Sequence, residues 1–383
     1  MIYLLLAFGV AAAAYQALAL AAALRQALKR EKAAPGGAPS PGVSILKPLH
    51  GLDPDFYEAV RSHALIDYPE FEILFGVSEA GDPAIAEIER LRAEFPAAAI
   101  RLIRSESAAP NRKVGVLADL AAAARYPILV VNDSDIRVEP DYLRRVTAPL
   151  ADPAVGMVTC LYRARARGLA GRFEAVGIAT DFAPGALVAP LVGVSGFALG
   201  STMAFRAEDL ARIGGFAAIA DYLADDHHLG RLIAGLGRRI VISTCVVETA
   251  VPDAGWRDMW RHQVRWARTI RLSRGGYFGL PIANGTLWAA ALAAAGQWRA
   301  ALALLALRLA AGLVTAGAVL RDRQTLARTY LIPLRDLAGA AIWVAGLFGA
   351  TVVWRDARLK LDRAGRILAA TSQGRGESPR LGG

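Results

Sequence analysis

Cysteine and histidine are scarce in this chain of 383 residues, which contains two cysteines and five histidines. A scaffold held by disulfide bonds is therefore not indicated. Cys160 and Cys245 lie in a region with the character of a cytosolic domain, where thiols stay reduced, so we predict that both are buried and unpaired. Two histidines adjoin two acids at 225–228, but consecutive side chains on a helix point in different directions, which disfavours a zinc site.

Acidic residues are outnumbered, since 34 Asp and Glu face 44 Lys and Arg and the net charge is +10. Hydrophobic residues make up 55% of the chain and the mean hydropathy is +0.34, values typical of a membrane protein. Nucleic acid would be one partner for the positive charge. We favour an anionic membrane surface and expect no nucleic-acid partner, because the basic residues crowd beside apolar segments at 25–32 and from Arg355 onward.

The first 24 residues are almost wholly apolar and end beside basic residues, but they lack the basic start and the cleavage site of a signal peptide. About 20 apolar residues suffice to cross a bilayer. We predict a transmembrane anchor at 1–24 with its basic end in the cytoplasm. A linker rich in basic residues, proline and glycine is expected at 25–42.

Three further apolar runs occur near the other end of the chain, at 279–295, 300–320 and 337–354. They predict two or three membrane segments within 276–354, followed by a basic tail at 355–383. Three full crossings would leave that tail outside, although its arginines and lysines favour the inside. One run is therefore expected to be re-entrant or to lie in the interface, and the sequence does not say which.

Between the apolar ends, residues 43–253 alternate between predicted strands and predicted helices. Short apolar runs indicate the strands, and apolar residues at helical spacing indicate the helices. The expected strands are 43–46, 71–77, 100–103, 128–131, 155–160 and 239–243, with helices at 53–66, 83–95 and 113–125. Such alternation predicts an α/β domain with a mostly parallel sheet.

The strand at 128–131 is followed by two acids, Asp133 and Asp135, with one residue between them. In an α/β domain, ligands bind at the carboxyl ends of the sheet strands. Two carboxylates there can hold Mg²⁺ or Mn²⁺, and that cation would neutralise a diphosphate. The motif therefore suggests an enzyme that acts on a nucleotide sugar. The competing interpretation is a pair of acids that cap the following turn.

Three other motifs carry candidate chemistry, each with a structural alternative. Asp226, at the expected first turn of a helix, is a candidate general base or an ordinary capping acid. Lys113 opens another helix and is a candidate phosphate ligand or a solvated surface lysine. Arg265 and Trp266 belong to an amphipathic helix expected at 254–275, which suits a membrane surface and could also bring both residues near a departing diphosphate.

The stretch at 183–205 is apolar, rich in glycine and proline, and interrupted by Ser195, Ser201 and Thr202. We interpret it either as an element at the bilayer surface that helps to admit a lipid or as a buried core segment. Both alternatives stay open.

Taken together, the motifs from about Val43 to about Arg271 resemble the ceramide glucosyltransferase-like family of membrane glycosyltransferases, which is family 21 and is related to family 2. Its bacterial branch associated with hopanoid biosynthesis looks closest. The resemblance implies a cytosolic GT-A domain, which is Rossmann-like with a mostly parallel sheet, flanked by transmembrane helices. The pieces that carry it are Leu46–Gly51, Asp67–Pro69, Gly81–Ile85, Asn111–Lys113, Asp133–Val138, Gly214–Phe216, Asp225–Asp226 and Arg265–Trp266.

The resemblance also implies roles for individual acids. Asp82 would contact the nucleotide, with Glu79 as an alternative close by. Asp133 and Asp135 would bind the metal. Asp226 would be the catalytic base of an inverting transfer.

Arg265 and Trp266 match the end of the (Gln/Arg)-x-x-Arg-Trp motif of the family. The chain departs from that motif at its first position, where His262 stands. Histidine still donates a hydrogen bond, but it carries no fixed charge near neutral pH. A role for His262 in binding the nucleotide sugar is therefore an expectation that rests on position alone.

The activity implied is transfer of GlcNAc or glucose from a UDP-sugar to a lipid hydroxyl, with Mg²⁺ or Mn²⁺ as cofactor. The acceptor would be a hopanoid of the bacteriohopanetetrol type or a ceramide. The protein would be a multi-pass protein of a bacterial-type inner membrane, with its catalytic domain facing the cytoplasm. The alternatives are a processive polysaccharide synthase, a non-catalytic scaffold that binds nucleotide or lipid, and a metal-dependent hydrolase.

Overall fold

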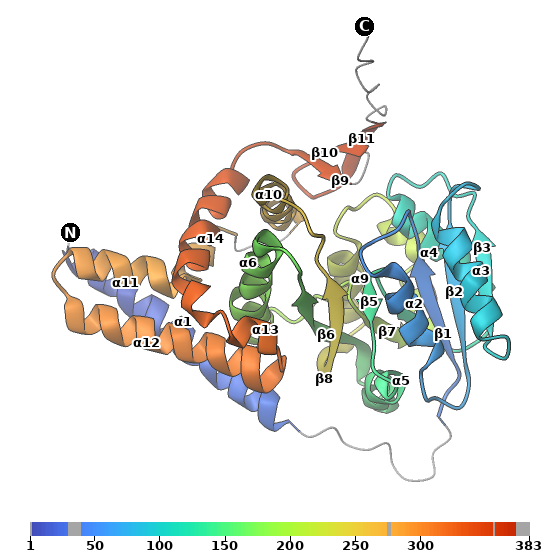
Figure 1. The fold of residues 1–383 in the computed structure, drawn as a ribbon, viewed down its shortest axis with the longest axis horizontal. Helices are drawn as coiled ribbons and strands as arrows, with labels where there is room; N and C mark the ends of the chain where they lie inside the picture. Colours follow the sequence, from blue (N-terminus) through green and yellow to red (C-terminus); the bar gives the residue numbers. More distant parts are fainter. Residues whose placement is uncertain (1, 30–39, 274–276, 355–356, 373–383) are drawn as a thin grey trace, which may run out of the picture.

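A computed structural model describes residues 2–29, 40–273, 277–354 and 357–372. Most of the predicted linker, at 30–39, and the tail residues 355–356 and 373–383 lie outside the described residues. The chain forms an α/β domain that is joined to a layer of apolar helices (Figure 1).

A mixed sheet of eight strands forms the centre of the α/β domain, in the order β3-β2-β1-β4-β7-β6-β8-β5. β1 pairs in parallel with β2 and β4, whereas β7 runs antiparallel between β4 and β6. The predicted α/β class with a mostly parallel sheet is confirmed. The strands are β1 Val43–Pro48, β2 Phe71–Val77, β3 Ile100–Arg104, β4 Ile128–Val131, β5 Ile136–Arg137, β6 Val155–Arg165, β7 Met203–Arg206 and β8 Arg239–Ala250.

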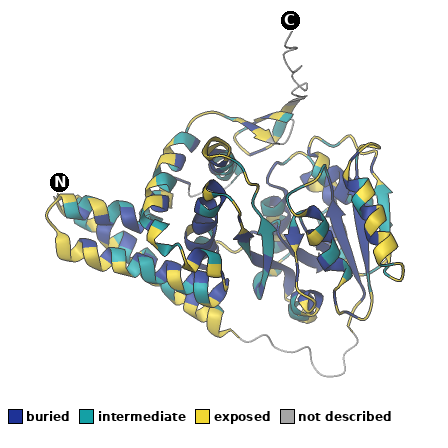
Figure 2. Ribbon diagram, viewed as in Figure 1, coloured by how far each residue is buried: buried dark blue, intermediate teal, exposed yellow. Residues whose placement is uncertain are grey.

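Alternate residues of the central strands face two separate cores, because side chains alternate along a strand. Ile45 of β1 and Val130 of β4 belong to the core beneath α2 (Phe56–Ala64), α3 (Ala84–Glu94) and α5 (Tyr142–Thr147). Leu46 and Val131 belong to the core beneath α4 (Arg112–Ala123) and α9 (Asp225–Gly235). The central strands are buried on both faces (Figure 2).

The strand order reverses between β1 and β4, since the chain proceeds from β1 through β2 to β3 on one side and places β4 on the other. At such a point the loops after the two strands leave a crevice, which is the usual ligand site of these sheets. The motif Asp133-Ser134-Asp135 directly follows β4 and therefore lies at this crevice.

Within the described residues, three helical segments are long and apolar enough to cross a membrane: α1 (Ile2–Leu28), Leu169–Val192 and Trp298–Val319. The first and third coincide with the predicted segments at 1–24 and 300–320. Leu169–Val192 contains α6 (Leu169–Gly177) and α7 (Ala183–Val188), and it was not predicted as one apolar helical segment.

Small residues bring these helices together. Gly9, Ala12, Ala19 and Ala23 share the buried face of α1, and small side chains let helix backbones approach closely. That face packs against α7, α11 (Gly285–Ala294) and α12 (Trp298–Val314). On the outside, apolar side chains such as Leu302 of α12, which is 66% exposed, are suited to lipid contact (Figure 2).

The apolar run at 337–354 does not form one helix of membrane length. Its helix is α14 (Ile332–Gly346), whose 15 residues reach about 22 Å, short of the roughly 30 Å of a bilayer core. After the helix ends, Thr351–Trp354 forms strand β9. The run at 279–295 is also shorter than predicted, because the side chain of Asn284 caps α11 and leaves a helix of ten residues.

The predicted basic tail is folded where it is described. β9 forms a three-stranded antiparallel sheet with β10 (Ala357–Leu361) and β11 (Ile367–Ser372). The amide of Ile367 donates to the carbonyl oxygen of Asp221 at 2.7 Å, and that of Leu223 donates to Gly365 at 3.2 Å. These strands thus pack on the segment that leads into α9.

The stretch at 183–205 divides into three parts. α7 is buried against α1, and the last residues form β7 inside the sheet. Between them, Val192 and Val194 are 58% and 54% exposed. The core interpretation thus holds at both ends, and only the middle exposes apolar side chains. Separately, Cys160 and Cys245 are buried and unpaired, as predicted.

Candidate active site

Two carboxylates contact one lysine at the carboxyl end of β4. The ammonium of Lys113 lies 2.8 Å from Asp133 Oδ1 and 2.9 Å from Asp225 Oδ2. Lys113 therefore joins the loop after β4 to the first turn of α9. Asp226 follows Asp225 on that turn. Residues that are far apart in the sequence therefore lie together at this site.

Gly200 lies between two of these acids. Its amide donates to Asp226 Oδ2 at 3.2 Å. A Cβ atom at residue 200 would stand 3.0 Å from Asp133 Oδ2, closer than most side chains tolerate. Glycine at this position thus lets the carboxylates of Asp133 and Asp226 approach the same stretch of backbone without crowding.

Asn111 positions Lys113 for these contacts. Its side chain accepts a hydrogen bond from the amide of Val114 and so caps α4, which begins at residue 112. The same side chain donates to the carbonyl oxygen of Tyr222 at 2.7 Å. The start of α4 is therefore tied to the segment that precedes α9, and Lys113 is held between them.

The charges of the group perturb one another. Burial raises the pKa of Asp135 to about 6, the negative charge of Asp133 adds to this, and a hydrogen bond from Thr249 opposes it. Burial by itself would lower the pKa of Lys113, but the charges of Asp133 and Asp225 raise it above its ordinary value. Lys113 is therefore a fixed cation.

A second lysine, Lys47, lies fully buried beneath the group and was missed by the sequence analysis. It donates to the carbonyl oxygen of Asp133 at 2.9 Å, and its ammonium is 3.5 Å from His63 Nε2. Burial lowers the pKa of Lys47 to about 7, although nearby acids oppose the shift. Burial also lowers the pKa of His63, whose Nδ1 is 2.9 Å from the carbonyl oxygen of Ala59. In the sequence, the sign that Lys47 has a special role was a lysine near the end of a mostly apolar strand, β1.

Asp82 and Glu79 lie on the loop after β2. Both carboxylate oxygens of Asp82 accept from the amide of Gly51, at 3.1 and 2.9 Å, and one also accepts from Ala84. Asp82 thus shapes the loops at the carboxyl ends of β1 and β2. Glu79 is exposed and lies 3.4 Å from Arg112. Their predicted contacts with a nucleotide stay predictions.

The amphipathic helix predicted at 254–275 is α10 (Trp256–Ser273), which packs against α6 and α14. Nδ1 of its His262 lies 2.6 Å from Oε1 of Glu174 on α6, and the ring lies 5.0 Å from that of Trp266. These contacts hold Trp266 in place. The expected role of His262 in binding the nucleotide sugar stays a prediction.

Trp266 connects α10 to the sheet through aromatic rings. Its ring is 6.0 Å from that of Phe182, which is 5.4 Å from that of Tyr162 on β6. Burial raises the pKa of Tyr162, and the charges of Asp135 and Asp226 contribute. This aromatic row therefore extends from the helical layer toward the acids. Arg265, beside Trp266, is half-buried.

The acidic group fits a divalent cation. Asp133 and Asp225 contact the ammonium of Lys113, Asp135 lies within range of the charge of Asp133, and Asp225 within range of that of Asp226. Among the described residues, no set of three or more His, Cys, Asp or Glu side chains forms a metal cluster. Mg²⁺ in nucleotide enzymes is usually held by one or two carboxylates together with substrate phosphates and water, and Asp133 and Asp135 can supply that share.

The sequence profile described as Glycosyl transferase family 21 matches residues 4–367. The chain belongs to glycosyl transferase family 21. The family assignment predicted from the motifs is thus confirmed. The match includes the apolar helical segments that precede and follow the α/β domain in the sequence.

Curated relatives cover part of this family 21 chain. It is 29% identical over 207 residues to ceramide glucosyltransferase 1 of Caenorhabditis elegans, which is 53% of this chain and 44% of that protein. It is 32% identical over 120 residues to the ceramide glucosyltransferase of Komagataella phaffii, 30% of this chain and 24% of that one. The aligned part spans less than half the length of either relative.

One solved structure has a similar fold over most of both chains. It is a mannosyltransferase from Pyrobaculum calidifontis, in complex with GDP-Man and Mn²⁺. The identity is 23%, the TM-score is 0.53, and the match covers 89% of this chain and 99% of that one. The likeness shows that the two share the GT-A fold.

Proposed function

We propose that this protein is an inverting glycosyltransferase that moves one sugar from a UDP-sugar to the hydroxyl of a membrane lipid. The observation that carries the proposal is the convergence of Asp133, Lys113 and Asp226 at the crevice between β1 and β4. Membership in family 21 and the ceramide glucosyltransferase relatives support the reaction class.

Asp226 is the proposed general base. Its carboxylate would accept the proton of the lipid hydroxyl while that oxygen attacks the anomeric carbon. The proton passes to Asp226, the new C–O bond forms on one face, and the bond to UDP breaks on the other. The configuration at the anomeric carbon is therefore inverted.

Other residues would bind and orient the donor. A divalent cation, held by Asp133 and Asp135 when bound, would neutralise the diphosphate. Lys113 keeps the two acidic segments together and adds a fixed positive charge beside the phosphates. Arg265 is proposed to offset the charge that develops on the departing UDP. Asp82, with Glu79 as the alternative, is proposed to contact the uracil or ribose.

The acceptor would approach from the helical layer. A lipid cannot leave the bilayer without exposing its chains to water, so its hydroxyl must be met near the membrane surface. The row of Trp266, Phe182 and Tyr162 extends from that layer to the acids and offers apolar surface to a lipid chain. We place the catalytic domain on the cytoplasmic face of a bacterial-type inner membrane.

The finer identity of the substrates is also a proposal. We infer UDP-GlcNAc or UDP-glucose as the donor, since ceramide glucosyltransferases are among the relatives. A hopanoid of the bacteriohopanetetrol type is the acceptor we favour, with ceramide second. Both lipids present hydroxyl groups at the end of a large apolar body.

A direct test uses the full chain in phosphatidylcholine nanodiscs. Labelled UDP-glucose or UDP-GlcNAc is supplied with a bacteriohopanetetrol-type hopanoid, ceramide or diacylglycerol, and the lipids are analysed by mass spectrometry and NMR. The expected product is a lipid that carries a single sugar of inverted configuration.

Other outcomes contradict the proposal in distinct ways. A long polymer would indicate a polysaccharide synthase, and free sugar made without any acceptor would indicate a hydrolase. Binding of UDP-sugar with no release of UDP under any of these conditions would indicate a non-catalytic scaffold.

A further inference from the structure

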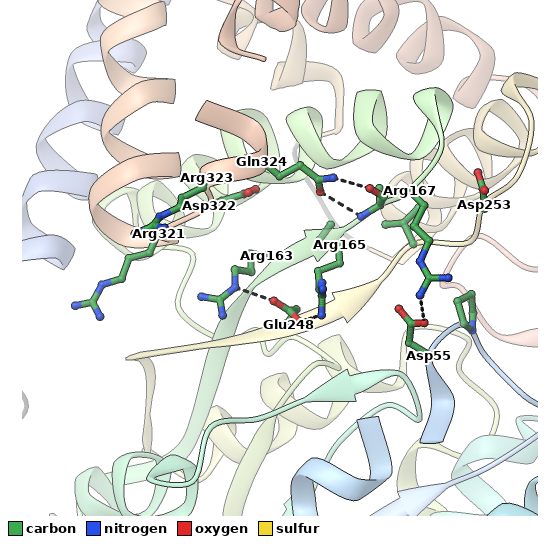
Figure 3. A pocket seen from close by; sticks show the side chains of 14 residues that line it. Asp55, Arg163, Arg165, Arg167, Glu248, Asp253, Arg321, Asp322, Arg323 and Gln324 are labelled. Atoms are coloured by element: carbon green, nitrogen blue, oxygen red, sulfur yellow. Dashed lines mark hydrogen bonds and ion pairs between the residues drawn. The ribbon is translucent and has the colours of Figure 1, made fainter. Parts of the chain in front are cut away.

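A second set of charged residues lines a cavity of about 510 Å³ between the end of β6 and the short helix α13 (Arg323–Leu326) (Figure 3). This volume is in the range of small-ligand sites. The proposed transfer reaction uses none of its side chains. Two segments far apart in the sequence supply five arginines: Arg163, Arg165, Arg167, Arg321 and Arg323.

The first three arginines come from one alternating run, Arg163-Ala-Arg165-Ala-Arg167. Side chains alternate along an extended strand, so the arginines share one face while the two alanines between them are buried. Glu248 of β8 pairs with Arg163 at 3.1 Å and Arg165 at 3.3 Å, and Asp55 pairs with Arg167 at 2.6 Å. Glu139 also lies 3.6 Å from Arg163, so each of these three arginines has an acidic partner.

The other two arginines carry the surplus charge. Arg321 and Arg323 are exposed, and in the described part of the chain neither side chain has a hydrogen bond or ion pair. Asp322 between them is turned to α13, where it accepts from the amide of Thr325 at 3.0 Å. Asp253 also lines the cavity, so five arginines face four acids there, and Arg321 and Arg323 are the guanidinium groups that no carboxylate of the described residues pairs with.

The backbone is strained at the same cavity. Among the described residues, the non-glycine residues with left-handed backbone are Asp55, at φ 54°, and Arg321, at φ 53°, and both line this cavity. Such strain in native structures clusters at functional sites. Glycine would fit residue 321 without strain, so the arginine there indicates a use for its guanidinium.

The cavity lies where the apolar helices leave the membrane. Arg321 follows the apolar segment Trp298–Val319 by two residues. The end of that segment, with Ala316 and Leu320, packs against Ala19 and Ala23 near the basic end of α1. Basic pockets at this level bind anionic lipid headgroups, and the planar guanidinium matches phosphate oxygens in pairs.

Gln324 of α13 connects the helical layer to the end of β6 beside this cavity. Its side chain accepts from the amide of Ala166 at 3.2 Å and donates to the carbonyl oxygen of the same residue at 2.5 Å (Figure 3). A ligand that contacts arginines of both segments, 163–167 and 321–323, would strengthen this connection.

We propose that this cavity binds a phosphate group, supplied by the headgroup of an anionic phospholipid, and thereby fastens the catalytic sheet to the apolar helices. A smaller cavity of about 270 Å³ shares Asp55, Arg165, Arg167 and Glu248 with it and reaches Asp135. A free phosphate or the phosphates of a nucleotide are therefore the alternative sources that the test must separate.

The test uses the full chain in nanodiscs of phosphatidylcholine alone or mixed equally with phosphatidylglycerol. Native mass spectrometry counts phosphatidylglycerol retained by the protein, and the melting temperature is measured in both lipids. We expect retained lipid and a higher melting temperature with phosphatidylglycerol. Arg321→Gly should lose the retained lipid and most of that rise, while its melting temperature in phosphatidylcholine stays equal or higher because the backbone strain is gone. Arg323→Gln should lose the rise as well.

Arg92→Ala on α3 is the matched control, since it removes one exposed arginine far from this cavity and should keep the full rise. Unchanged lipid retention in both Arg321→Gly and Arg323→Gln would overturn the site. An equal rise with inorganic phosphate in detergent, or displacement of the lipid by UDP, would overturn the assignment to a lipid headgroup. None of these readouts depends on sugar transfer.

Discussion

Two groups of charges in this protein are arranged in opposite ways. In the helical layer, Arg308 of α12 and Asp336 of α14 form a bidentate ion pair with distances of 2.6 and 2.9 Å, and both residues are at least 95% buried. Thr286 donates a further hydrogen bond to Asp336. At the end of β4, by contrast, the ammonium of Lys113 contacts the carboxylates of Asp133 and Asp225, and the charges of Asp135 and Asp226 lie within range of these two acids.

The contrast separates a structural group of charges from a candidate binding site. A buried ion pair that satisfies both partners attracts no further ion, and it supports the packing of the helices around it. An acidic group whose carboxylates outnumber its lysines keeps a negative surplus that favours a divalent cation. The second group is also partly open to solvent, since the side chain of Asp133 is 40% exposed.

Asp226→Asn gives the largest expected effect and tests the site at the end of β4. Sugar transfer should fall by about 10²–10⁴-fold, because amide nitrogen and oxygen cannot accept the proton as a carboxylate does. UDP binding and the melting temperature should stay near those of the wild type. Asp221→Asn, an exposed position five residues earlier, is the control and should transfer sugar normally. Near-normal turnover in Asp226→Asn would remove Asp226 from the mechanism.

Arg308→Met tests the balanced pair. It leaves the carboxylate of Asp336 buried without its cation, so unfolding in detergent should become easier by about 3–5 kcal/mol. The double variant Arg308→Met/Asp336→Leu should recover most of that loss, since neither charge remains. If the double variant were as unstable as the single one, the pair would be needed for more than charge balance.

Asp135→Ala tests whether the acids at the end of β4 bind a metal ion. UDP binding measured by calorimetry should depend on Mn²⁺ in the wild type and should be lost with a chelator. In the variant, the affinity in Mn²⁺ should fall by at least about 10–100-fold, the usual cost of disturbing the support of a metal site. Asp67→Ala, an exposed surface acid, should bind as the wild type does. Equal UDP affinity with and without Mn²⁺ in the wild type would contradict a metal at this site.

Lys47→Met has the smallest expected effect and reports on the support beneath the acids. The pKa of Lys47 is about 7 in the folded protein against 10.5 in the unfolded chain. Below pH 7 both states hold the proton, and the fold bears the cost of a buried ammonium. Between these values only the unfolded state stays protonated, so the destabilisation by Lys47 shrinks as pH rises. The melting temperature of the variant minus that of the wild type should therefore decrease from about pH 7 upward.

Arg92→Ala provides the reference for that pH series, because its charge does not change in this range and its difference from the wild type should stay constant. A difference for Lys47→Met that is equally flat would show that Lys47 does not change its protonation near neutral pH.

The apolar helices show how well hydropathy predicts membrane-length helices in this chain. Long apolar runs predicted α1 and the segment Trp298–Val319, since a bilayer-length helix needs a composition that the sequence displays directly. They did not reveal that the apolar run at 337–354 is divided between a short helix and the edge strand β9. Val352 and Val353 suit a strand as well as a membrane helix, and the pairing of β9 with β10 decided between them.

Local pattern in the sequence determined the α/β class, the buried strands, the acids after β4 and the family, because each of these depends on neighbouring residues or on their order. Only the tertiary structure decided that Lys113 joins Asp133 to Asp225, that Lys47 lies beneath them and that the arginines of two distant segments line one cavity. Such contacts depend on how segments far apart in the sequence pack together in the fold. The charge balance of a site depends on the same packing, because it brings the charged side chains together.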